Sequence, residues 1–205
     1  MSDASHAATA EFLGRLRADS IASAELGEFL DGLGHEDRVA ATRATKRSDQ
    51  RRLYAASDGF REVTLRDLVA PPVPALTTVR HFGKNTLPAF THFEKRFCRP
   101  GDADPDEPKQ LWGFNFQTMQ PLTGPGYFVA REDPDRREVL VDYHEVPPSA
   151  PPGWPPVQRN ERGRGRFVYG FMIDTLRRVS EHVTIGSAAR KGKDMGSWFM
   201  LVREA

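Results

Sequence analysis

The chain has 205 residues, of which 39% are hydrophobic and 28% are charged, and these values are typical of one globular domain with a small extension. Its 29 Lys and Arg residues nearly balance its 28 Asp and Glu residues, so the overall charge disfavours nucleic acid or an anionic membrane as a partner. No apolar run is long enough to span a membrane, and the first residues lack the pattern of a signal peptide. We therefore expect a cytoplasmic protein with no membrane partner.

The first part of the chain has the periodicity of short amphipathic helices. One apolar stripe follows a candidate N-cap at Ser23 and recurs at i, i+3, i+4 and i+7, in Leu26, Phe29, Leu30 and Leu33. Between residues 36 and 47 the acidic residues come first and the basic residues last, which is the order that a helix dipole favours. We expect residues 7–57 to be mainly helical. The stripe could pack inside the protein or dock onto a protein partner.

Residues 69–74, with the sequence VAPPVP, form the clearest boundary in the chain. Their prolines forbid a helix and favour an extended connector. The predicted organisation is an N-terminal helical region over residues 1–68, a proline-rich connector over residues 69–78 and an antiparallel β domain over residues 79–205.

After the connector the hydrophobic period changes from 3.6 to 2, which is typical of strands. The segment LWGFNFQTM alternates the aromatic residues Trp112, Phe114 and Phe116 with smaller or polar ones. Further strands are expected at residues 127–131 and 138–146, followed by a final hairpin of 183–189 and 197–203. From residue 167 onward a strand is favoured by the dense β-branched and aromatic residues, with a helix as the alternative. We expect residues 110–204 to be mainly antiparallel strand.

Two segments of this part are expected to lie outside strands. The prolines from Pro147 onward and the charged stretch up to Arg164 predict a long exposed loop. The sequence HFGKN, residues 81–85, predicts a turn, with a binding loop as the alternative, because Gly83 permits close backbone approach. The fold class predicted by all these elements is α+β, with a small N-terminal helical region followed by an antiparallel β-barrel or a strongly curved sheet.

The last strands resemble those of the lipocalin-like β-barrel proteins that carry a GxWxG motif. In the segment from 170 to 204, the matching positions are Ile173, Asp174, Arg177, Val179, Ile185, Gly186 and Phe199. The stretch FEKRF, residues 93–97, is similar to an aromatic-Gly-Lys-Arg-Phe stretch of that family, with Glu94 in place of the glycine. The GxWxG motif itself is absent. The resemblance implies a barrel, but a barrel does not by itself imply a function.

The aromatic residues of the predicted strands favour a module that binds a small hydrophobic or aromatic ligand inside a barrel. The same residues could instead fill a solid core that has no cavity. The residues expected to contact such a ligand are Trp112, Phe114, Phe116, Tyr127, His92 and Arg177.

Two other functions are compatible with the sequence. One is an enzyme that uses a histidine of the barrel cavity, such as His92 or His144, as its acid–base group. The other is an interaction protein that docks through its N-terminal helices. The sequence contains no Walker loop, dinucleotide fingerprint, nucleophile elbow or HExxH motif, and it identifies no catalytic residue or cofactor. No metal is predicted, because the histidines have no diagnostic spacing.

Overall fold

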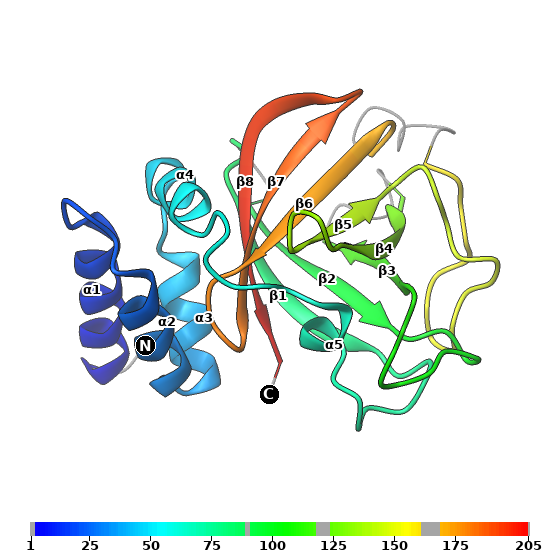
Figure 1. Cartoon of the computed structure of the whole chain (residues 1–205), viewed down its shortest axis with the longest axis horizontal. Helices are drawn as coiled ribbons and strands as arrows, with labels where there is room; N and C mark the ends of the chain where they lie inside the picture. Colours follow the sequence, from blue (N-terminus) through cyan, green and yellow to red (C-terminus); the bar gives the residue numbers. More distant parts are fainter. Residues whose placement is uncertain (1–2, 89–90, 118–123, 161–168, 205) are drawn as a thin grey trace.

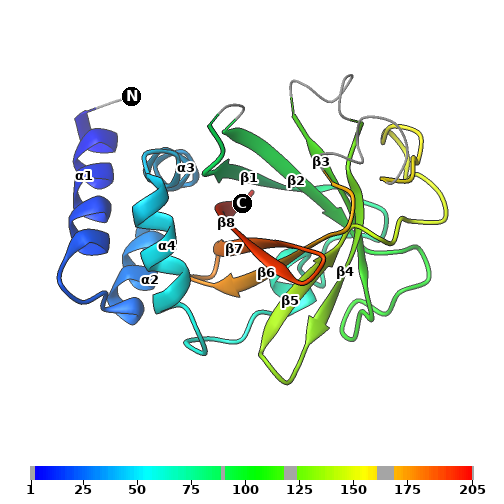
Figure 2. The same cartoon turned by 90° about the horizontal axis from the view of Figure 1, so that it is seen from above.

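The computed structural model of the chain describes residues 3–88, 91–117, 124–160 and 169–204. These residues form a helical layer and a closed antiparallel barrel, which lie side by side (Figure 1, Figure 2). The α+β class and the antiparallel barrel predicted from the sequence are confirmed.

Each strand of the barrel pairs with its neighbours in the chain, and the last strand pairs with the first. This closure leaves neither edge of the sheet with unpaired backbone groups. In the described residues the strands are β1 (Val79–Asn85), β2 (His92–Cys98), β3 (Leu111–Phe116), β4 (Tyr127–Asp133), β5 (Glu138–Asp142), β6 (Met172–Arg178), β7 (Val183–Arg190) and β8 (Lys193–Arg203).

The helices precede the barrel in the chain, and residues 7–57 are mainly helical, as predicted. They are α1 (Asp3–Arg17), α2 (Ser23–Gly32), α3 (His35–Arg43), α4 (Arg47–Ala56) and the short α5 (Leu65–Leu68). The first four lie together on one side of the barrel, whereas α5 lies at one end of it (Figure 1, Figure 2).

A hydrophobic core joins the helical layer to the outer face of the barrel. Side chains alternate along β8, so Met200 and Val202 pack outward against the helices while Leu201 packs inside the barrel. Leu26 and Leu30 of α2 belong to the same outer core. The other two residues of the predicted apolar stripe are partly buried against it, so the stripe packs inside the protein.

The sequence HFGKN is strand rather than turn, because residues 81–85 lie within β1. The glycine that suggested a turn serves close packing instead. A Cβ atom on Gly83 would lie 2.6 Å from the ring of Phe93 on the paired strand. Only a residue without a side chain leaves room for that ring.

The described part of the second proline-rich segment, residues 147–160 after β5, covers part of the outer face of the barrel. Residues 148, 149, 152, 153, 156, 158 and 159 are exposed, as predicted, but other residues of the segment are anchored. Trp154 donates its indole N–H to Thr78 Oγ1 at 2.7 Å and lies 4.7 Å from the ring of Phe114. The buried amide of Asn160 donates to the backbone oxygen of Tyr127 at 2.6 Å. Residues 161–164 of the predicted loop lie outside the described residues.

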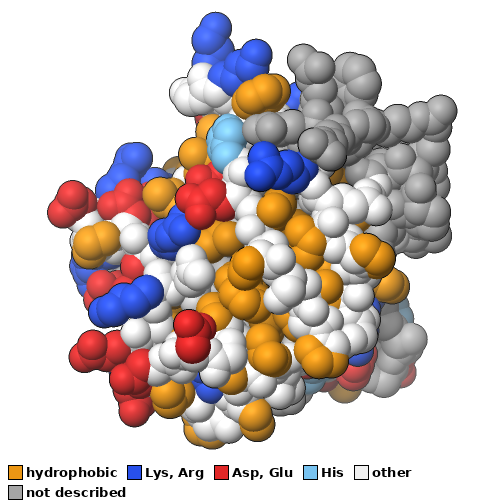
Figure 3. Space-filling view, turned by 90° about the vertical axis from the view of Figure 1, so that its right-hand side faces the viewer, with side chains coloured by type: hydrophobic (Ala, Val, Ile, Leu, Met, Phe, Trp, Pro, Cys, Tyr) orange, Lys and Arg blue, Asp and Glu red, His pale blue; other side chains and the backbone are white. Residues whose placement is uncertain are grey.

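The face of the molecule farthest from the helices includes this segment. On it, hydrophobic side chains lie among uncharged surface near the middle, and charged side chains gather toward one side (Figure 3). The connector before β1 is anchored by Arg99, which donates to the backbone oxygens of Ala70, at 2.9 Å, and Pro71, at 3.1 Å.

A substitution at Gly113 tests how tightly side chains pack inside the barrel. A Cβ atom at this position would lie 2.1 Å from the buried ring of Phe128 and 2.7 Å from the backbone oxygen of Arg96. We expect Gly113→Ala to lower the free energy of unfolding by about 1–3 kcal/mol, as overpacking does. Gly14→Ala is the control, because nothing lies within 4 Å of its added Cβ in α1. That change should raise the free energy of unfolding by about 0.5–1 kcal/mol. Urea denaturation measures both, and equal effects would contradict the packing.

Candidate functional site

The interior of the barrel is filled at one end and hollow at the other. At the end near α5, Leu65 and Leu68 of that helix pack with Phe97, Leu111 and Phe128 of the strands in one apolar core. At the other end lies a cavity of about 350 Å³, which is within the usual size range of small-molecule sites. Residues at the ends of β1 and β3 and in the β7–β8 hairpin contribute to it, namely Asn85, Gln117 and Met195.

The wall of this cavity is mostly apolar. Phe93 and Phe199 meet edge to face at 6.0 Å between ring centroids, and Tyr143 and Tyr169 stack at 5.6 Å with an angle of 12° between their planes. All four line the cavity. Stacked and edge-to-face rings of this kind give a flat ligand apolar surface to pack against.

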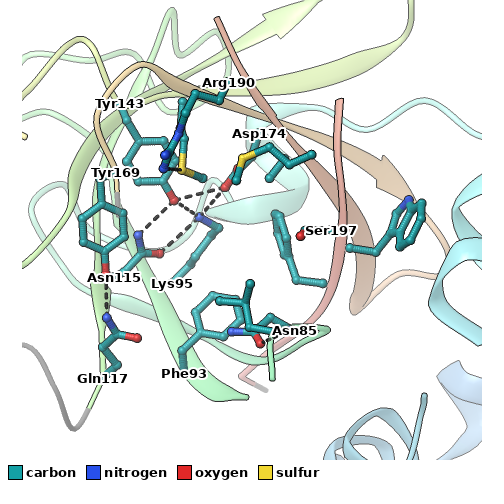
Figure 4. Close-up of a pocket in the computed structure, with 16 residues that line it drawn as sticks. Asn85, Phe93, Lys95, Asn115, Gln117, Tyr143, Tyr169, Asp174, Arg190 and Ser197 are labelled. Carbon is teal, nitrogen blue, oxygen red and sulfur yellow. Dashed lines mark hydrogen bonds and ion pairs between the residues drawn. The ribbon is translucent and has the colours of Figure 1, made fainter. Parts of the chain in front are cut away.

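Four polar side chains meet where the cavity joins the filled half (Figure 4). We call them the polar quartet: Lys95 of β2, Asn115 of β3, Tyr143 just after β5 and Asp174 of β6. Lys95 lies between the inward-facing Phe93 and Phe97, two residues away on either side. The period of two along a strand therefore directs its side chain into the barrel.

The quartet is joined by direct hydrogen bonds. Lys95 Nζ donates to Asp174 Oδ2 at 2.9 Å, to Asn115 Oδ1 at 3.2 Å and to the Tyr143 hydroxyl. The Tyr143 hydroxyl donates to Asp174 Oδ2 at 3.1 Å and accepts from Asn115 Nδ2 at 2.9 Å. All four residues are at least 96% buried, so their compensation comes from one another.

Burial sets the electrostatics of the quartet. It lowers the pKa of Lys95, against the opposing charge and hydrogen bond of Asp174. It also raises the pKa of Tyr143 well above its usual value. Aromatic rings surround the ammonium, and its nitrogen lies 4.9 Å from the ring centroid of Phe128 and 5.1 Å from that of Phe199. Ring faces attract a desolvated cation, which partly offsets the cost of its burial.

One oxygen of the quartet has no partner. Asp174 Oδ1 is buried and accepts no hydrogen bond, whereas Oδ2 of the same carboxylate accepts two. Unsatisfied buried acceptors are costly, and the residue that carries this one lines the cavity.

The four aromatic residues expected to bind a ligand lie outside this cavity's wall. In β3, Leu111 belongs to the inner core, Gly113 faces the ring of Phe128 and Asn115 joins the quartet, so the alternate residues Trp112, Phe114 and Phe116 face outward. Tyr127 lies beside Phe114 on that outer face, at 5.7 Å between ring centroids, and Trp154 packs against both.

The two polar residues of the same expectation also lie elsewhere. His92 is exposed at the start of β2. Arg177 bridges the barrel to α4 from outside, since it donates to Glu138 Oε1 at 2.7 Å and to the backbone oxygen of Tyr54 at 2.8 Å. Ligand binding by the six expected residues stays a prediction, and the structure brings a different set together around the cavity.

Sequence reasoning missed the polar quartet, although a signal for it was present. Lys95 stands between Phe93 and Phe97, and Asp174 between Met172 and Leu176, at the apolar phase of each strand. A charge among inward-facing residues is rarely tolerated unless it is paired. An inward-facing charge on each of two strands indicates a buried ion pair. That Lys95 pairs with Asp174 follows only from the geometry of the barrel.

The histidines do not contribute to this cavity. All six lie in the described residues, and none is among those that line it. His81 is inside the barrel but in the filled half, where its Nε2 lies 3.0 Å from the backbone oxygen of Leu68. Burial lowers the pKa of His81 to about 3, so it is neutral at pH 7. Its neutral imidazole donates to that oxygen.

Metal ligands, the cysteine and the helices of the described residues point to no other kind of site. No group of three His, Cys, Asp or Glu side chains in the described residues could hold a metal ion. Burial raises the pKa of the lone Cys98 to about 12, which leaves its thiol protonated and unreactive. Among the described helices, none has both the length and the apolar character needed to cross a membrane.

Comparison with known proteins assigns no family. No protein-family model matches the chain, and no curated protein matches its sequence.

Removal of one charge of the Lys95–Asp174 pair should be far more costly than removal of both. We expect Lys95→Met and Asp174→Leu each to lower the free energy of unfolding by about 3–5 kcal/mol, because each leaves the other charge buried alone. The double variant should cost much less than the sum of the two. Arg131→Ala is the control, because its ion pair with Glu145 is exposed and should contribute at most about 1 kcal/mol. Additive effects in chemical denaturation would contradict the coupling.

The buried His81 should make the fold sensitive to acid. Its pKa is about 3 in the folded protein and 6.5 when unperturbed, so the unfolded chain binds the proton first as the pH falls. Wild-type protein should therefore lose about 2 kcal/mol more stability between pH 7 and pH 5 than His81→Gln, which keeps a donor but does not titrate. His6→Gln, on the exposed surface of α1, should behave like wild type. Parallel stability curves for wild type and His81→Gln would rule this account out.

Proposed function

We propose that the protein binds a small, mainly apolar or aromatic ligand in the cavity of its barrel. The observation that carries the proposal is a single cavity wall in which aromatic rings lie next to a buried, hydrogen-bonded polar quartet. An apolar wall with a few polar groups at one point is the usual composition of a small-molecule site, because the wall supplies affinity and the polar groups fix orientation.

Two further features support a site over a solid core. The half of the barrel near α5 is packed with side chains such as Phe97 and Phe128, whereas in the other half Tyr143, Tyr169 and Phe199 of the same core line a cavity. The resemblance of the C-terminal strands to lipocalin-like proteins also agrees with a barrel that holds a ligand, as an analogy of fold alone.

An enzyme working in the same cavity is the second candidate. No histidine of the described residues lines the cavity, so its acid–base groups would be Lys95, Tyr143 and Asp174. These three side chains are hydrogen-bonded to one another. Perturbed pKa values beside a cavity favour proton transfer, but buried ion pairs of structural origin have them too. Docking of a protein partner through α2 is less supported, because its apolar stripe packs against the barrel.

The cavity can be tested by filling it. Ala188 of β7 is buried and lines the cavity, whereas the neighbouring Ser187 does not. We expect Ala188→Phe to weaken binding of an aromatic probe such as 2-naphthol at least about tenfold, because the new ring occupies the space. Ser187→Phe adds the same ring at the next position along the strand and should bind as wild type does. Calorimetric titration measures both.

Native mass spectrometry of the purified protein gives an independent measurement. Retention of an organic ligand by wild type and its loss in Ala188→Phe would support the proposal. Equal binding of the probe by wild type and Ala188→Phe, with both proteins folded, would remove the cavity as the binding site.

A further inference from the structure

In the polar quartet every hydrogen-bond donor is used, whereas one acceptor is not. As an ammonium, Lys95 has three N–H donors, and they go to Asp174, Asn115 and Tyr143. The hydroxyl proton of Tyr143 goes to Asp174 Oδ2. The two N–H donors of Asn115 go to the Tyr143 hydroxyl at 2.9 Å and, more weakly, to the backbone oxygen of Gly126 at 3.5 Å. Every donor of the quartet therefore has an acceptor.

The acceptors are in surplus. Asp174 Oδ1 is buried and accepts nothing, and the residue lines the cavity. A carboxylate oxygen in a desolvated place gains more from a donor than a neutral oxygen does, because its hydrogen bonds are charge-assisted. The quartet therefore favours a ligand that brings a donor over one that brings only an acceptor.

The charge of the quartet restricts the ligand further. One ammonium and one carboxylate lie 2.9 Å apart, so the pair has no net charge to offer an ionic ligand. A second carboxylate placed beside Asp174 would be repelled, and a second ammonium would compete with Lys95. A neutral donor meets neither obstacle.

We infer that the ligand of the cavity is a neutral aromatic molecule with a hydroxyl group, and that this hydroxyl donates to Asp174 Oδ1. This inference rests on the proposed function, since it assumes that the cavity binds a ligand. The rings of Phe93, Phe199 and Tyr169 would pack against the aromatic body of the ligand, with the hydroxyl directed toward the quartet. Figure 4 shows Phe93 and Tyr169 beside the quartet.

The test compares probes that differ only in the polar group. At pH 7, 2-naphthol carries a neutral hydroxyl, 2-methoxynaphthalene carries an ether oxygen without a donor, and 2-naphthoate carries a carboxylate. By calorimetric titration of wild-type protein we expect 2-naphthol to bind at least about tenfold more tightly than the ether, a difference equal to about 1.4 kcal/mol. The comparison needs no variant, so it does not depend on the stability of one.

Variants then assign the preference to Asp174. The double variant Lys95→Met/Asp174→Leu removes the acceptor and the charge pair together, and its preference for 2-naphthol over the ether should fall to about twofold or less. Ser197→Ala removes a different hydroxyl from the same cavity wall and should keep the wild-type preference. Loss of the preference in Ser197→Ala, with its retention in the double variant, would overturn the assignment.

The possible failures are distinguishable. Equal affinity of wild type for 2-naphthol and the ether would overturn the hydroxyl inference and leave the cavity as a binding site. Tightest binding of 2-naphthoate would also overturn it, and would assign the polar recognition to Arg190, which lines the cavity too. Binding of none of the three probes would overturn the proposed function and the inference with it.

Discussion

The buried ion pair between Lys95 and Asp174 is the constraint on which the barrel interior depends. Two charges that have left water must be compensated on every side, and here the compensation comes from Asn115, Tyr143 and the surrounding ring faces. The ion pair lies on β2 and β6, and its hydrogen-bonding partners lie on β3 and just after β5, so the network joins strands that do not all touch one another. It also lies between the half of the interior that is packed near α5 and the half that contains the cavity.

The outer face of the barrel packs against the rest of the chain. The helices cover β7 and β8 with an apolar core, and Arg177 adds charged and hydrogen-bonded contacts to α4 and Glu138. The proline-rich segment covers β3 and β4 through Trp154, which packs on Phe114 and Tyr127. Aromatic residues on this face thus stabilise the packing of long connections, whereas those on the inner face either fill the half near α5 or line the cavity.

The two faces explain why a buried polar site can coexist with a stable fold. The inner core of the barrel and the outer core under the helices are both apolar, and the outer one packs on β7 and β8 rather than on the strands that carry the quartet. Apolar burial of this extent can offset the cost of desolvating one ion pair and of leaving one carboxylate oxygen without a partner. The unpaired oxygen of Asp174 is therefore a local cost that the apolar cores can offset.

The sequence by itself determined the kinds of element and their order. Period 3.6 in residues 7–57 and period 2 from residue 110 onward are local properties of helices and strands, and both predictions are confirmed. The strand at residues 81–85 was not predicted, because its glycine and polar residues indicated a turn. The phase of β3 was also visible, since Trp112, Phe114 and Phe116 alternate with their neighbours, but alternation does not say which face points inward. Closure of the barrel decided that, and it turned the aromatic face outward and Asn115 inward. The quartet likewise depends on strands that are distant in sequence, so only the tertiary structure could bring Lys95 to Asp174. The reason is physical: periodicity follows from the geometry of a single element, whereas compensation of a buried charge requires a partner from another one.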